Sequence, residues 1–186
     1  MHSQITMSEA TTMTAEVSAP LTPIPQEGLT ELAAKNKANP ADKTLKVKTV
    51  CTGKFRSLNY ARDLDAFAID EPPVLLGDNT APNPSEIVLG ALGSCLVVGI
   101  QANAAAKGIS LTKLEIALEG DINIVSTWGT GELEKPQIGF TDVRVKVDID
   151  GDAARAVLEE MVNHANTWSP VSATLSNPMP VSVSMA

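Results

Sequence analysis

The longest patterned segment of the sequence is an almost uncharged stretch near its middle. Residues 87–100 carry no charge and show no polar face. Asn83 before this stretch is a good N-cap, Glu86 completes a capping box with it, and Gly108 suits the C-terminal cap. The pattern predicts a helix over residues 84–107. Because it is apolar all round and rich in glycine, we expect it to be buried at the centre of the fold.

Alternation of apolar and polar residues on both sides of this helix predicts strands. The Cys51–Lys54 stretch between the first two segments reads as a turn. The expected strands are residues 45–48, 55–60, 66–69, 112–125, 141–149 and a closing strand at 181–185.

Two further helices are expected. A short one covers residues 30–35, and a second one begins after Asp150-Gly151-Asp152. The second has one apolar stripe that should pack on the central helix or on a sheet, formed by Ala153, Val157, Leu158, Met161 and Val162. Helices segregated from antiparallel strands indicate an α+β fold.

The chain of 186 residues fits one domain of ordinary size. Residues 1–27 are rich in Ser, Thr, Pro, Ala and Met without periodicity, which favours a disordered or extended segment. We therefore expect a single domain over residues 28–186.

Composition and charge exclude several classes of function. A net charge of -8 without a cluster of basic and aromatic residues argues against nucleic acid as a partner. No segment has the character of a lipid-facing span, so we expect a cytoplasmic protein that does not bind membranes. Two cysteines are too few for a disulfide scaffold, and with two isolated histidines they give no metal-ligand spacing.

Cys95, in the run LGALGSCL, is the main candidate for chemistry. A buried cysteine can simply be a small apolar side chain, and composition alone does not make it reactive. It lies too far inside the predicted helix for the helix dipole to favour a thiolate, so a cation must do so. Arg56 and Arg62 are the candidates, and each can equally be a surface charge.

The exit of the last predicted helix, residues 164–172, gathers polar groups, an indole and a proline. Trp168 and Ser169 can form part of a pocket wall. Alternatively, Trp168 fills the core and the hydroxyls of Ser169 and Ser172 act as caps.

Three blocks of the sequence resemble the OsmC/Ohr family, and its OsmC-like branch in particular. The resemblance implies an intertwined homodimer in which two central helices lie against curved sheets and each pocket is assembled from both chains. The three blocks are Asp70-Glu71-Pro72, LGDNTAPNPSEIVLGALGSCL and WSPVSATLSNPMPVSV.

The resemblance also implies a thiol-dependent reduction of organic hydroperoxides, without a cofactor, by a Cys95 thiolate. In the family a second cysteine resolves the resulting sulfenic acid, but Ser169 stands at its position here and a hydroxyl cannot form a disulfide. Cys51 is one substitute, and an external thiol or a dithiol reductant protein is another. The alternatives are a dimer that binds a small apolar ligand or senses oxidants without turnover, and a purely structural Cys95.

Family members hold the thiolate with an arginine and a glutamate. The resemblance favours Arg62 over Arg56 for the arginine. The glutamate matches one position away from Glu86, at Ser85. Nine residues of helix turn about 900°, which puts Glu86 on the face opposite Cys95 and about 13 Å away along the axis, so Glu86 can instead be only a cap.

Overall fold

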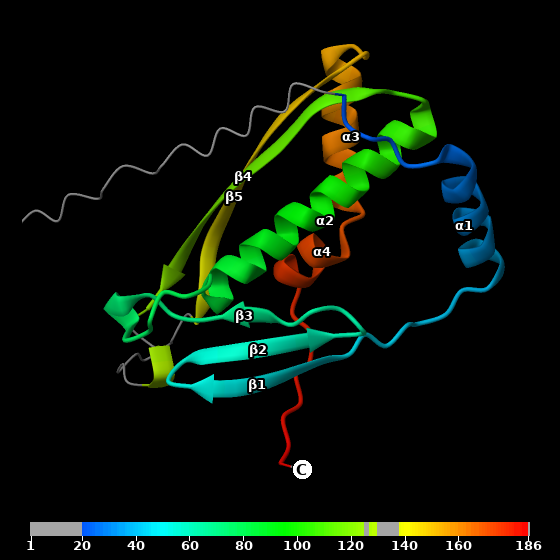
Figure 1. The fold of residues 1–186 in the computed structure, drawn as a ribbon. Coiled ribbons are helices and arrows are strands. Elements are labelled where there is room, and N and C mark those ends of the chain that lie inside the picture. The colour runs from blue at the N-terminus through cyan, green and yellow to red at the C-terminus, as the bar shows by residue number, and fades with distance from the viewer. Residues whose placement is uncertain (1–19, 125–126, 130–137, 186) are drawn as a thin grey trace, which may run out of the picture.

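The protein adopts an α+β fold, seen in a computed structural model that describes residues 20–124, 127–129 and 138–185. Within these residues the strands form a three-stranded sheet and a separate two-stranded sheet, both antiparallel. Figure 1 shows the two sheets as distinct units on either side of a long helix, α2. The expected class is therefore confirmed.

The three-stranded sheet is built from β1 (Val47–Gly53), β2 (Arg56–Ala61) and β3 (Phe67–Ile69), in that order. The expected turn at Cys51–Lys54 is wrong in its position, because Cys51 pairs with Ser57 inside the β1–β2 ladder. The chain reverses at Lys54 and Phe55, where Lys54 takes a positive φ of 46°. β-Branched neighbours on both sides of Cys51 favour extension of the strand up to Gly53.

The two-stranded sheet pairs β4 (Leu111–Asn123) with β5 (Gly139–Gly151) along their whole lengths. This confirms the two strands that alternation predicts. Leu114, Ile116 and Leu118 lie on the half-buried face of β4, and charged residues occupy the other face. A short 3-10 turn, η2 (Thr127–Gly129), lies in the connection between the strands.

Helix α2 (Pro84–Lys107) has the bounds that its caps predict. Asn83 Oδ1 accepts a hydrogen bond from the Glu86 N–H, Glu86 Oε2 accepts one from the Asn83 N–H, and Gly108 ends the helix at a φ of 66°. By length and composition α2 could cross a membrane, but here β4 and the helices α1, α3 and α4 pack on it.

Burial of α2 in the single chain is one-sided. Leu92, Leu96 and Ile100 are buried against β4, β5 and the C-terminal helices, whereas Val98 is 65% exposed. The sequence predicts burial all round, but the described part of the chain leaves one uncharged face of this helix uncovered.

Helix α1 (Gln26–Ala38) starts earlier than the short helix expected at residues 30–35. Its Gln26 Nε2 donates to the Ala106 carbonyl at the end of α2, and Leu21 before it packs against the core. The ordered part of the chain therefore begins ahead of residue 28, while residues 1–19 of the predicted extension lie outside the described residues.

The C-terminal helices α3 (Arg155–Thr167) and α4 (Pro170–Ser176) pack beside α2. The expected apolar stripe of α3 is confirmed, since Leu158 and Met161 are buried in the core. A 3-10 turn, η1 (Pro73–Leu75), precedes α2 in the chain. The buried core is Ile100, Ala104, Leu111, Ile149, Leu158, Met161 and Ala165.

The C-terminal tail does not form the expected closing strand. Residues 177–185 have no assigned secondary structure, and the chain runs away from the body of the fold in Figure 1. Val181, Val183 and Met185 are 75%, 92% and 98% exposed. The alternating pattern is present, but no strand of the described chain pairs with it.

Candidate functional site

Cys95 lies at the middle of α2 on the side that meets the turn between α3 and α4. Its side chain is half-buried, and the Ser169 hydroxyl donates a hydrogen bond to Cys95 Sγ at 3.1 Å. Ser169 itself is only 3% exposed. The structure therefore brings together the two positions that the sequence singled out, although 74 residues separate them in the chain.

Ser169 is held in place as the N-cap of α4. The Ser172 N–H donates to Ser169 Oγ at 3.1 Å, and the Ser169 N–H donates to the Asn166 carbonyl at the end of α3. Ser172 Oγ in turn donates to Asn166 Oδ1 at 2.8 Å. The expected capping role of Ser169 is confirmed, whereas Ser169 is not among the described residues that line the cavity.

A close approach of α2 and α3 makes this contact possible. A Cβ at Gly99, one turn after Cys95, would lie 2.9 Å from the Ala165 Cβ and 3.2 Å from its Cα. Two small residues therefore let the helix backbones come together here. Because Ser169 follows Ala165 by one turn, this packing sets its distance to Cys95.

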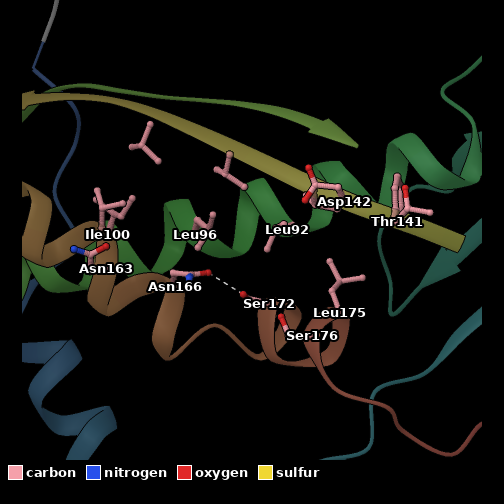
Figure 2. Close-up of a pocket in the computed structure, with 15 residues that line it drawn as sticks. Leu92, Leu96, Ile100, Thr141, Asp142, Asn163, Asn166, Ser172, Leu175 and Ser176 are labelled. Atoms are coloured by element: carbon pink, nitrogen blue, oxygen red, sulfur yellow. Dashed lines mark hydrogen bonds between the residues drawn. The ribbon is translucent and has the colours of Figure 1, made fainter. Parts of the chain in front are cut away.

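A cavity of about 580 Å³ opens beside the site, between α2, β5, α3 and α4. Figure 2 shows Leu92, Leu96 and Ile100 pointing into it from α2, opposite residues of α3 and α4. Cys95 is not among the described lining residues, but its neighbour Leu96 is, and so is Ser172, whose N–H binds Ser169 Oγ. The other lining side chains are Phe140, Thr141, Asp142, Val143, Val145, Val147, Val162, Asn163, Asn166, Ser172, Leu175 and Ser176.

The walls of the cavity differ in polarity. α2 and β5 supply aliphatic side chains, whereas α3 and α4 supply amides and hydroxyls at Asn163, Asn166 and Ser172. Asp142 carries the one charge of the lining, and Arg144 Nη1 binds it at 2.6 Å. Such a site suits an uncharged molecule with an apolar body and a hydrogen-bonding group.

Neither candidate arginine contacts Cys95 within the described chain. Arg56 Nε donates to Thr80 Oγ1 and its Nη1 donates to Thr52 Oγ1, both at 3.3 Å. Arg62 is exposed in the turn after β2, with a positive φ of 54°. Arg56 is thus tied to the loop before α2, and Arg62 has the freedom of a surface side chain.

Asp70 anchors that loop, a role that sequence reasoning missed. Its carboxylate is buried and accepts hydrogen bonds from the Glu71 N–H, the Thr80 N–H and the Thr80 hydroxyl, at 2.9, 3.0 and 2.7 Å. These bonds, those from Thr80 first, lower the pKa of Asp70 to about 2. Arg56 joins the same network through Thr80, so the loop holds both charges in one unit.

The acidic residues beside α2 do not contact Cys95 in the described structure. Glu86 serves in the capping box with Asn83. Burial, followed by the charges of Glu86 and Asp70, raises the pKa of Glu71. Glu71 Oε2 is buried without a hydrogen-bond partner among the described residues. The only sequence signal for this residue is that it directly follows Asp70.

The remaining candidates lie on the surface. Trp168 is 74% exposed, stacks at an angle on His164 with ring centroids 6.1 Å apart, and neither fills the core nor lines the cavity. Cys51 is exposed on β1, in the sheet that does not carry α2, and is a free thiol like Cys95. Among the described residues no cluster of His, Cys, Asp and Glu could hold a metal ion.

Comparisons with known proteins agree on one family. The model of the OsmC-like protein family matches residues 77–184. No curated protein matches the sequence. Among solved structures, an OsmC-like protein from Mycoplasma pneumoniae is similar with a TM-score of 0.60 and 16% identity, over 73% of this chain and 89% of that one.

Two other structures show the same fold. A putative osmotic stress induced and detoxification response protein from Psychrobacter arcticus has a TM-score of 0.58 at 14% identity, over 73% of this chain and 90% of that one. An organic hydroperoxide resistance protein from Legionella pneumophila has a TM-score of 0.53 at 20% identity, with the same coverage.

Proposed function

The chain belongs to the OsmC-like family, and on this premise we propose that it takes part in oxidative stress defence by reducing organic hydroperoxides at Cys95. The observation that carries the proposal is the position of the thiol: it is half-buried, bonded to Ser169, and one residue before Leu96, which lines a cavity with aliphatic side chains on α2. A peroxide with an apolar body fits this cavity better than hydrogen peroxide, which gains nothing from aliphatic walls.

The reaction moves one oxygen atom. The Cys95 thiolate attacks the outer oxygen of the hydroperoxide, the O–O bond breaks, and the alkoxide leaves and takes a proton from solvent to become the alcohol. Cys95 becomes a sulfenic acid. Ser169 carries no thiol, and Cys51 lies on β1 of the three-stranded sheet. In this proposal an external thiol or dithiol reductant therefore restores Cys95.

The cation for the thiolate comes, in this proposal, from Arg56 or Arg62 of a second copy of the chain. Among the described residues of one chain, neither arginine contacts Cys95 and one uncharged face of α2 is uncovered. The exposed apolar tail at Val181 and Val183 is a further surface that an intertwined homodimer would cover. We expect such a dimer to be soluble and cytoplasmic and to need no cofactor.

Binding of a small apolar ligand, or oxidant sensing without turnover, is the second candidate. The same cavity supports it, and so does the serine at the resolving position, because a sensor needs no internal route back to the thiol.

A consumption assay separates the two functions. The protein is mixed with cumene hydroperoxide and, in turn, a monothiol or dihydrolipoamide as the reductant. Peroxidase activity requires thiol-dependent consumption over many turnovers that Cys95→Ser abolishes and Cys51→Ser leaves intact. A single equivalent consumed, with no turnover under either reductant, would reject the enzyme and favour the sensor.

A further inference from the structure

We infer that Ser169 is a positioning residue that directs its one hydroxyl hydrogen onto the sulfur of Cys95. The inference rests on the proposed chemistry of Cys95 and adds to it a group that holds the thiolate from the same chain. It also gives the serine a function at a position where a second thiol would otherwise act.

The donor and acceptor sites of the hydroxyl determine its orientation. A serine hydroxyl has one hydrogen to donate and two lone pairs to accept. The Ser172 N–H occupies one lone pair at 3.1 Å, and the hydroxyl donates its hydrogen to Cys95 Sγ at 3.1 Å. With only 3% of Ser169 exposed, water has little access to compete for that hydrogen.

This arrangement favours the charged sulfur. A hydrogen bond that a donor makes to an ion is about twice as strong as one to a neutral group, so Ser169 stabilises the thiolate more than the thiol. The same donor can stabilise the sulfenate that oxidation leaves on Cys95. Since the hydroxyl cannot condense with it, the oxidised sulfur stays available to an outside thiol.

An external thiol reduces the Cys95 sulfenic acid back to the thiolate in two steps. The external thiol attacks the sulfenic acid, forms a mixed disulfide with Cys95 and releases water. A second equivalent of thiol attacks the mixed disulfide, leaves as the oxidised reductant and frees the Cys95 thiolate. Ser169 forms no covalent bond in either step.

The first test measures the rate of iodoacetamide alkylation of Cys95 against pH, in the full chain with Cys51→Ser as background. For Ser169→Ala we expect alkylation at neutral pH to be several-fold slower, because the variant loses a hydrogen bond to the charged sulfur. Ser169→Thr keeps both donor and cap, so its profile should return toward that of the background.

Thr167→Ala is the matched control, because its hydroxyl donates to the Asn163 carbonyl and not to sulfur. Loss of the α4 cap will lower the stability of Ser169→Ala, but a purely structural serine would leave the pH profile in place. An unmoved profile in a folded Ser169→Ala variant therefore overturns the inference.

The second test uses Ser169→Cys in the same background. A thiol at this position starts within about 3.1 Å of Cys95 Sγ and needs only a small rotation to reach disulfide length. Cumene hydroperoxide should then convert Cys95 from a dimedone-reactive sulfenic acid into an intramolecular disulfide. A Ser169→Cys variant that stays dimedone-reactive would show that residue 169 does not face the sulfur.

Alkylation does not depend on peroxide turnover, which keeps the two claims separate. A shifted profile without any peroxide consumption would sustain the role of Ser169 and reject the peroxidase. If Ser169→Ala consumes peroxide as the parent does and its alkylation profile is unshifted, the peroxidase is sustained and the role of Ser169 is rejected.

Discussion

Replacement of Gly99 by alanine tests the helix contact on which the site depends. The new Cβ would lie 2.9 Å from the Ala165 Cβ, closer than real Cβ atoms approach one another, and 3.2 Å from the Ala165 Cα, which is backbone that cannot rotate away. Overpacking of this kind costs about 1–3 kcal/mol. Alanine gains about 1 kcal/mol over glycine inside a helix, so Gly99→Ala should be destabilised by between about 0 and 2 kcal/mol in total.

The matched control is the exchange of the two residues. Ala165→Gly alone should lose about 1 kcal/mol of helix propensity, but in Gly99→Ala/Ala165→Gly the two propensity changes cancel and most of the clash is removed. The double variant should therefore be close to the parent protein, which corresponds to a coupling of about 1–3 kcal/mol in a double-mutant cycle.

Urea unfolding at one fixed protein concentration measures all four free energies of unfolding. If α2 and α3 touch as described, the cycle shows this coupling and Gly99→Ala also slows alkylation of Cys95 by displacing Ser169. A Gly99→Ala variant that is stabilised by the full propensity gain, with additive behaviour in the cycle, would refute the close approach.

Three further outcomes follow from the site and its loop. Asp70→Asn should lower the free energy of unfolding at neutral pH. Because the pKa of Asp70 falls from 3.8 to about 2 on folding, its stabilising effect is present above pH 4 and is lost as the pH drops toward 2. The free energies of unfolding of the two proteins should therefore converge as the pH approaches 2, and parallel curves of free energy against pH would contradict this prediction. Cys51→Ser should leave the pattern of Cys95 oxidation unchanged, and a loss of reduction by thiols in this variant would show that Cys51 resolves after all. The rate of Cys95 alkylation at pH 7 should be at least several-fold lower than the parent rate in one of the two variants Arg56→Met and Arg62→Met. If both variants react at the parent rate, neither arginine stabilises the thiolate.

Local signals in the sequence were sufficient for α2, β4 and β5, but they gave no sign of helix α4. The capping box of Asn83 and Glu86 and the αL position of Gly108 fix both ends of α2 within a few residues of chain, so the helix is predicted at its observed bounds. The long alternation in β4 and β5 likewise leaves one register in which each strand buries its apolar face.

Features that depend on contacts between residues far apart in the chain could not be predicted from the local sequence pattern. Residues 181–185 alternate as a strand does, but a strand also needs an edge to pair with, and the described chain offers it none. Cys51 follows β-branched residues and precedes a glycine, so strand and turn signals overlap and only pairing with Ser57 decides between them.

The sequence predicts which residues belong to the site better than it predicts the contacts between them. Cys95 and Ser169 were both singled out by resemblance to the OsmC/Ohr family. That Ser169 caps α4 and at the same time bonds the sulfur depends on how α3 packs on α2, which no short-range signal encodes. Asp70 was missed because a lone acid before a proline-rich loop gives no sign of its burial.

Oxidation of Cys95 can be followed by mass spectrometry of the native protein after one equivalent of cumene hydroperoxide, with dimedone present. We expect a dimedone adduct at Cys95 that forms faster than with hydrogen peroxide, is absent in Cys95→Ser, and is replaced by a mixed disulfide when a monothiol is added. A Cys95 that stays unmodified while the protein is folded and the peroxide is intact would contradict this expectation.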